Sequence, residues 1–372
     1  MQVILFIGHH KVGSTSLQQF LSENHRNLLQ AGILYPSVEA QGFAHNIANA
    51  LNPDIPTHSL PINVREAHNA LAFKMMAENS KRKVPPYHKN LPNSRQMLVA
   101  IQEQIKVLKP HTVILCAEVF ANFAAVDRLL IRQLYNAFKM HDITLTCTLR
   151  RPDEYVTSWQ GQRLKFGQQL EPLDGAGLES YFPTIHFDYQ KMLKAWIDIF
   201  KGARLVLRDY RDVLKSGGSV EDFIIHSGAD FPKNLPQSAN SNPSIARPLM
   251  EIARRANHVL SGSQSHELRQ YLLNCPERIA LPPNRDVEMF GTKNRALLIK
   301  QFAPIHDWLG HITDKAQFFP DIDAAAKLRP LPVAKASKTA LKALQKDADQ
   351  YLGDPAALEF IQQLNLESFD FP

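Results

Sequence analysis

The chain has 372 residues, of which 44% are hydrophobic and 21% are charged, so it can bury a large core and is not expected to be disordered. Lysine and arginine exceed aspartate and glutamate by 42 to 36, which gives a net charge of +6 that is spread along the sequence. This mild excess favours anionic ligands but does not indicate nucleic acid as a partner.

An apolar run at residues 2–7 opens the sequence and predicts a buried strand. A glycine-bounded loop follows at residues 8–13, and Leu17 and Phe20 then recur at the spacing of a helix. From 40 to 93 the pattern weakens, and prolines interrupt short helical fragments, so we interpret this region as an insertion that covers or borders the site. It carries a basic cluster of Lys81, Arg82, Lys83, His88 and Lys89.

Strands and helices alternate in the next part of the chain, which indicates right-handed crossovers and a mainly parallel sheet covered on both faces. The chain after Pro243 is mostly helical in pattern, and residues 328–332 look like a linker. We therefore expect an α/β domain at 1–325 and a linker with a helical tail at 326–372. The expected strands are residues 112–117, 143–149 and 204–207, and the expected helices are residues 97–108, 129–138 and 219–226.

The three cysteines favour a reducing compartment. Cys116 and Cys147 lie in apolar runs typical of buried strands, and Cys275 leaves the count odd, so we expect packed thiols. The first apolar run is too short for a secretory signal, and no segment reaches the roughly 18 to 20 apolar residues of a membrane helix. We expect a cytoplasmic protein without a membrane span.

The first loop is a candidate anion site, because a glycine-rich loop and the following helix N-terminus direct N–H groups towards one point. Gly8 and Gly13 have the spacing of the phosphate loop of nucleoside triphosphatases, but that motif places lysine directly after the second glycine. Here Ser14 stands in that position, and Lys11 lies inside the loop, beside the place of a shorter anion. A solvated loop lysine is the alternative. The candidate ligands are Lys11, Val12, Gly13, Ser14, Thr15 and Ser16.

A second candidate anion site follows the strand at 143–149. Arg150 leaves the carboxyl end of that strand, where open α/β sheets bind ligands. Pro152 suits the first turn of a helix, and Ser158 lies about two turns along it. The guanidinium and the hydroxyl are suited to a second phosphate, although a surface arginine beside a helix is a common arrangement.

Together the two motifs resemble the sulfotransferases that depend on 3'-phosphoadenosine 5'-phosphosulfate (PAPS). Lys11, Gly13, Ser14 and Thr15 are in register with that family's 5'-phosphosulfate loop, with His10 in place of a proline. Arg150, Pro152 and Ser158 match its 3'-phosphate motif. The resemblance covers about 300 residues; in it Tyr210 matches a tyrosine near the adenine, and residues 240–257 resemble bacterial carbohydrate-type members.

The resemblance implies a P-loop-NTPase-like three-layer fold and in-line sulfuryl transfer from PAPS to an acceptor hydroxyl, with 3'-phosphoadenosine 5'-phosphate (PAP) as product and no metal. It implies an acceptor that is a saccharide or glycolipid. The general base is a histidine or glutamate whose position varies in the family. Glu118 directly follows a predicted strand, and Glu39 and His45 enter from the insertion; we favour Glu118 and His45 over Glu39.

Two other functions remain open. A P-loop NTPase or small-molecule kinase would share the sheet and the loop, but the order of the loop residues argues against it. A non-catalytic protein that binds a polyanion would explain the positive charge but not the paired anion sites.

Overall fold

The computed structural model describes residues 1–52, 60–80, 83–237 and 244–366, so Lys81, Arg82 and Asn240 of the sequence analysis lie outside the described residues. The chain forms two compact units, each built from separate stretches of sequence. The first unit comprises residues 1–150, 188–240 and 309–318, and the second comprises residues 151–187, 241–308 and 319–372.

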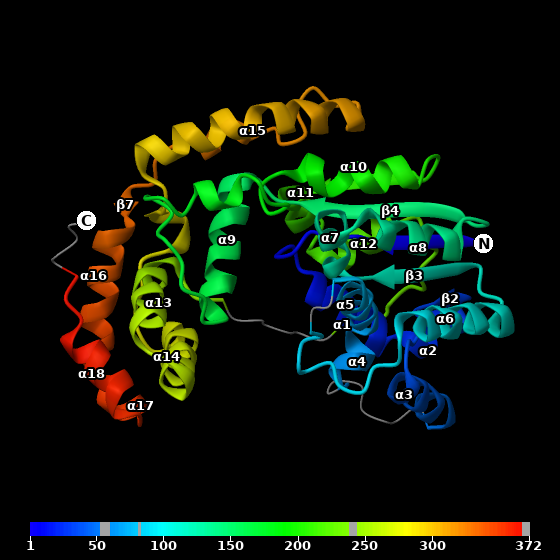
Figure 1. The fold of residues 1–372 in the computed structure, drawn as a ribbon, viewed down its shortest axis with the longest axis horizontal. Helices are drawn as coiled ribbons and strands as arrows, with labels where there is room; N and C mark the ends of the chain where they lie inside the picture. The colour runs from blue at the N-terminus through cyan, green and yellow to red at the C-terminus, as the bar shows by residue number, and fades with distance from the viewer. Residues whose placement is uncertain (53–59, 81–82, 238–243, 367–372) are drawn as a thin grey trace. The chain divides into compact units, whose positions relative to one another are not determined.

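A five-stranded sheet forms the centre of the first unit (Figure 1). All its strand pairs are parallel, as the alternation of apolar runs and helical patterns predicted, and the protein has the expected α/β fold. The strands lie in the order β2, β3, β1, β4 and β5. They are β1 (Gln2–Phe6), β2 (Ile33–Leu34), β3 (Thr112–Cys116), β4 (Asp142–Leu149) and β5 (Arg204–Asp209).

The register brings three strand ends to one edge of the sheet. Phe6, the last residue of β1, lies opposite Cys116 of β3 on one side and Thr146 of β4 on the other. The segments that leave β1, β3 and β4 therefore start next to one another, at the carboxyl edge where such sheets bind ligands.

Both faces of the sheet are buried. Ile4 and Phe6 pack into an apolar cluster with Leu17 and Phe20. The alternate residues Val3 and Leu5 point to the opposite face and are also fully buried. Alternation within a continuous apolar run thus supplies both faces, as parallel sheets require.

Helices surround this sheet and connect its strands. The helices predicted at 97–108, 129–138 and 219–226 correspond to α6, α8 and α12, and an asparagine capping box at Asn93 starts α6 earlier than the apolar pattern did. The helices of the first unit are α1 (Ser14–Glu23), α2 (His25–Gln30), α3 (Ala40–Leu51), α4 (Ile62–Arg65), α5 (Ala67–Ser80), α6 (Ser94–Leu108), η1 (Glu118–Asn122), α7 (Phe123–Val126), α8 (Arg128–Phe138), α10 (Tyr189–Ile199), α11 (Tyr210–Lys215) and α12 (Ser219–His226).

The region at 40–93 is more ordered than its weak pattern suggested, because α5 buries residues along most of its length and contacts η1 and β3. The described members of its basic cluster are not all exposed. Lys83 and Lys89 are exposed, but His88 is buried, and its Nδ1 lies 2.9 Å from Asn63 Oδ1.

The second unit is mainly helical, as expected for the chain after residue 243. The long helix α15 (Gly291–Thr313) starts in this unit and ends in the first. The other elements are α9 (Pro152–Lys165), η2 (Glu179–Tyr181), α13 (Arg247–Val259), α14 (Gly262–Asn274), η3 (Cys275–Glu277), η4 (Asn284–Asp286), β6 (Val287–Glu288), η5 (Ile322–Ala325), β7 (Leu331–Pro332), α16 (Val333–Leu344), α17 (Ala348–Tyr351) and α18 (Pro355–Gln363).

The residues expected to be a linker are part of this unit. Strand β7 pairs in parallel with β6, and the backbone N–H of Arg329 donates to Glu288 at 2.7 Å. Helix α16 packs against α13 and buries Ala336, Leu341 and Leu344. The apolar face of α16 explains why the tail joins the second unit.

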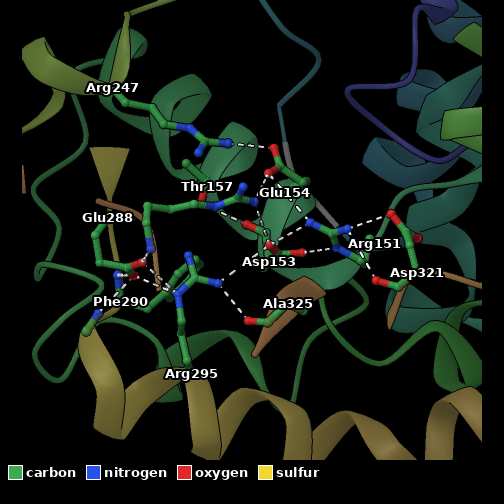
Figure 2. Close-up of polar contacts among 12 residues, drawn as sticks. Arg151, Asp153, Glu154, Thr157, Arg247, Glu288, Phe290, Arg295, Asp321 and Ala325 are labelled. Carbon is green, nitrogen blue, oxygen red and sulfur yellow. Dashed lines mark hydrogen bonds and ion pairs between the residues drawn. The ribbon is translucent and has the colours of Figure 1, made fainter. Parts of the chain in front are cut away.

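Ion pairs, in part buried, connect the start of α9 with α13, α15 and Arg329 of the second unit (Figure 2). Asp153, in the first turn of α9, accepts from Arg151 Nε at 2.6 Å and lies 3.7 Å from Arg295 of α15. Glu154 pairs with Arg247 of α13 at 2.5 Å and with Arg329 at 3.0 Å. Apart from the pair of Arg151 with Asp153, these ion pairs join residues far apart in the chain and carry no sequence motif.

The three cysteines are buried and are not joined in disulfides. Among the described residues, no helix is long and apolar enough to cross a membrane.

Candidate functional site

Backbone hydrogen bonds hold the start of the phosphate loop, residues 8–16, against β4. His9 N–H donates to the Thr148 carbonyl at 3.0 Å, and Thr148 N–H donates to the Gly8 carbonyl at 3.0 Å. His10 follows, with Nε2 3.2 Å from the amide nitrogen of Asn122 in η1, and burial lowers the pKa of its imidazole to about 4. His10 is therefore neutral near pH 7 and adds no charge to the loop.

Two glycines shape the loop because a side chain at either position would collide with its surroundings. Gly8 has φ of 117°, and a Cβ there would lie 3.0 Å from Ala121 Cβ. Gly13 has φ of 85°, and a Cβ would lie 2.7 Å from the Ser219 hydroxyl, which donates to the Gly13 carbonyl. Lys11 itself is left-handed, with φ of 61°, so the loop is tightly turned at three positions.

The loop leads directly into the N-terminus of α1. Gly13 is the N-cap and offers no side chain, so the first N–H groups of α1 depend on partners outside the helix. Ser14 is buried, whereas Thr15 and Ser16 are partly exposed. With the helix dipole, these groups suit an anion such as phosphate or sulfate.

Glu118 lies beside this loop. It starts η1 one residue after β3, and its carboxyl accepts a hydrogen bond from Gln18 of α1 at 3.1 Å, with the Ser14 side chain of the loop nearby. Asn69 of α5 donates to its other oxygen, also at 3.1 Å. Glu118 does not cap a helix, since the N-cap of η1 is Ala117.

The surroundings of Glu118 raise the pKa of its carboxyl from an ordinary 4.5 to about 7. Burial is the largest cause, and the negative charge of Glu66 adds to it, while the donors Asn69 and Ser14 act in the opposite direction. A carboxyl with this pKa exchanges its proton near neutral pH, as a general base must.

An open pocket of about 310 Å³ also adjoins the loop. It is lined by Val12, Gly13 and Ser16 from the loop side and by Tyr210 and Gly217 from α11 and its end. A planar base has room here, next to an aromatic ring and the anion loop.

Arg150 and Tyr210 lie together at the carboxyl ends of β4 and β5. The Arg150 guanidinium carbon is 5.1 Å from the centre of the Tyr210 ring, an attractive cation–π geometry. The Arg150 carbonyl accepts from the Tyr189 hydroxyl at 2.6 Å, which fixes the backbone at the strand end. Two residues that the sequence motifs identified separately are thus neighbours.

The remaining candidates are on α3 and α9. Glu39 is the N-cap of α3, and its two oxygens accept from the N–H groups of Gln41 and Gly42 at 2.7 and 2.8 Å. His45 is partly exposed on α3. Ser158 lies in α9, which belongs to the second unit.

Sequence reasoning missed the side chains that hold Glu118. Gln18 follows the loop at helical spacing and carried no motif, while Glu66 and Asn69 lie in the region of weak pattern at 40–93. A polar residue among the apolar positions of α1 was the one available signal, since Gln18 is fully buried. Among the described residues, no group of three histidine, cysteine or carboxylate side chains is placed to bind a metal.

No model of a known protein family matches the chain. An uncharacterized protein from Archaeoglobus fulgidus is 27% identical over 170 residues, which is 44% of each protein, so the chain spans less than half the length of this curated relative. The crystal structure of a sulfotransferase from Alicyclobacillus acidocaldarius matches 87% of this chain and 98% of its own, with a TM-score of 0.37 and 11% identity. Neither similarity assigns a function to the chain.

Proposed function

We propose that the protein transfers a sulfuryl group from PAPS to an acceptor hydroxyl. The observation that carries the proposal is the position of Glu118: its carboxyl, with a pKa raised to about 7, accepts from Gln18 of α1 at 3.1 Å beside the phosphate loop. A general base is most effective when its pKa lies near the working pH and when it stands within reach of the reacting group.

The donor would bind along the carboxyl edge of the sheet in the first unit. Lys11 and the N–H groups at the start of α1 would hold the 5'-phosphosulfate, and the pocket beside Tyr210 would take the adenosine. Arg150, stacked on Tyr210, would read the 3'-phosphate. Ser158 is assigned to that phosphate from the motif spacing alone.

The reaction would be an in-line displacement at sulfur. The Glu118 carboxylate removes the proton of the acceptor hydroxyl, and the acceptor oxygen bonds to sulfur as the bond from sulfur to the bridging phosphate oxygen breaks. Lys11 and the loop N–H groups stabilise the charge on the departing oxygen, and PAP leaves. The step consumes no metal ion and no redox equivalent.

The acceptor class comes from the resemblance of residues 240–257 to bacterial carbohydrate-type members, of which residues 240–243 lie outside the described part of the chain. We assign a saccharide or glycolipid hydroxyl as the acceptor on this ground. We propose the cytoplasm as the location because the odd count of three cysteines favours a reducing compartment.

A calorimetric titration with PAP, in buffer containing EDTA, tests donor binding. We expect binding that adenosine 5'-phosphate does not match, because it lacks the 3'-phosphate. Incubation with PAPS and a panel of neutral saccharides and glycolipids should then release PAP only in the presence of an acceptor. Failure to bind PAP would refute the proposal, and magnesium-dependent hydrolysis of ATP would replace it with an NTPase function.

A further inference from the structure

Glu66 connects α4 to α5 and places a second carboxylate next to Glu118. One of its oxygens accepts from the Arg65 guanidinium at 3.0 Å, and the other accepts from the Asn69 side-chain amide at 3.1 Å. Its side chain is 15% exposed, so water screens it only in part. The chemistry proposed above does not use Glu66.

Asn69 joins the two carboxyls. The same amide nitrogen that donates to Glu66 donates to Glu118 at 3.1 Å, and Asn69 is only 1% exposed. Its carbonyl oxygen accepts from the Val119 N–H at 3.5 Å, which directs the amide nitrogen towards the carboxyls. The carboxyls of Glu66 and Glu118 therefore share one buried donor, the side-chain amide of Asn69.

We propose that Glu66 is a positioning residue that acts through Glu118: with Asn69 it holds the Glu118 carboxyl beside the phosphate loop. The inference rests on the proposed function, in which Glu118 is the general base. Glu66 lets the base be protonated in part near neutral pH and keeps it oriented towards the loop.

The groups around Glu118 determine in which direction each substitution changes the pKa of its carboxyl. A second negative charge and burial both disfavour its ionisation, while hydrogen bonds from neutral donors favour it. Removing the charge of Glu66 should therefore ease ionisation, and removing the Asn69 amide should hinder it. The groups that face Glu118 or Glu66 are Ser14 and Gln18 of α1, Tyr35, Arg65, Asn69, Tyr87, His88 and Cys116.

The experiment is a carbon-detected NMR titration of the protein labelled with carbon-13 at the glutamate carboxyl, with the Glu118 signal assigned by its loss in Glu118→Gln. In Glu66→Gln we expect the titration midpoint of the Glu118 carboxyl to move to a lower pH by about one unit. It should not reach 4.5, because burial remains. Glu103→Gln is the matched control, since Glu103 is exposed on α6 and pairs with Lys106 at 3.6 Å.

Asn69→Ser is the second variant and should move the midpoint of Glu118 in the opposite direction. Shifts of opposite sign would not arise from a loss of packing alone. A Glu118 midpoint that stays in place in both variants, or that moves equally in Glu103→Gln, overturns the inference.

The titration uses neither donor nor acceptor, so its result separates the inference from the proposed function. Opposite shifts in a protein that does not bind PAP would retain the coupling of Glu66 to Glu118 and reject the sulfuryl transfer. PAPS turnover with an unshifted midpoint would do the reverse.

Discussion

The Arg150 guanidinium lies over the ring of Tyr210, 5.1 Å from its centre, at the carboxyl ends of two adjacent parallel strands. The pairing with Tyr210 holds the Arg150 guanidinium beside the pocket that opens next to the phosphate loop. The motif that contains Arg150 could not by itself have identified this position. The pairing also gives the Tyr210 ring a role, as the partner of Arg150, that does not depend on contact with the adenine of a nucleotide.

Replacing Arg150 should therefore affect one phosphate of the nucleotide selectively. We expect Arg150→Ala to weaken PAP binding by about 10- to 150-fold, the effect of about 1.5 to 3 kcal/mol for a hydrogen bond to a charged group. Adenosine 5'-phosphosulfate, which lacks the 3'-phosphate, should lose little. Calorimetry with both nucleotides measures the difference, and Arg132→Ala, at an exposed position of α8, is the control. Equal losses for the two nucleotides would contradict the assignment.

Replacing Lys11 should remove catalysis and preserve the fold. We expect Lys11→Ala to lower the rate of PAP formation from PAPS by about 10²- to 10³-fold, the usual loss when one stabilising donor is removed. The backbone at Lys11 has φ of 61°, which costs lysine and alanine alike because both carry a Cβ, so the substitution adds no backbone strain. Lys109→Ala is a matched control, because Lys109 is an exposed lysine at φ of 48° at the end of α6. Unchanged turnover in Lys11→Ala would remove the mechanism.

The strands and the loop could be predicted because they depend on local sequence. The run at residues 3–7 is continuously apolar, and Gly8 and Gly13 mark the loop that follows it, so the sequence indicated the strand, the loop and the helix. Glu118 was identified by its place after β3, which needs only the rule that parallel strands share a carboxyl edge.

The partners of Glu118 could not be predicted, because they come from distant parts of the chain. Asn69 and Glu118 are 49 positions apart in the sequence. Helix α4, which lies between the phosphate loop and Asn69 in the sequence, has only four residues, too few for a periodic pattern. Glu39 is the N-cap of α3 and binds the N–H groups of Gln41 and Gly42. Any helix that starts at this position would offer these two N–H groups. The pairing of β7 with β6 within the stretch expected to be a linker could not be predicted, because a two-residue strand leaves no periodic signal in the sequence.

The pKa of Glu118 predicts how the rate depends on pH. Because the base must be ionised, the rate of PAP formation should rise with pH, with a midpoint near 7. A rate that is flat from pH 5.5 to 8.5, measured in the same acceptor assay, would show that Glu118 is not the base.

The raised pKa of Glu118 also predicts that the unfolding free energy falls as the pH rises, whereas the rate increases. The folded pKa is raised, so the contribution of Glu118 to stability is present below the unfolded value of 4.5 and is lost as pH rises through 7. Urea denaturation of Glu118→Gln should therefore show a smaller fall in unfolding free energy between pH 5 and 8 than the parent protein, by on the order of 2 to 3 kcal/mol. Parallel curves for the two proteins would contradict the raised pKa.

Asp153 should be the most sensitive carboxylate of the second unit, because it is 2% exposed and contacts three arginines (Figure 2). Burial alone would raise the pKa of its carboxyl, but Arg151, with Arg295 and Arg329, holds the pKa below its ordinary value of 3.8. Asp153→Asn would leave these cations without their shared counter-charge, and we expect a loss of about 3 to 5 kcal/mol in unfolding free energy.

The pH dependence separates this electrostatic effect from a packing defect. A lowered folded pKa stabilises the protein above the unfolded pKa, and this contribution is lost as pH falls below about 4. The difference in unfolding free energy between the parent protein and Asp153→Asn should therefore be largest at neutral pH and should shrink in acid. Asp349→Asn, at an exposed position in the first turn of α17, should show no comparable loss. A difference that is the same at pH 3 and pH 7 would mean that Asp153 acts through shape, since protonation would then leave its contribution unchanged.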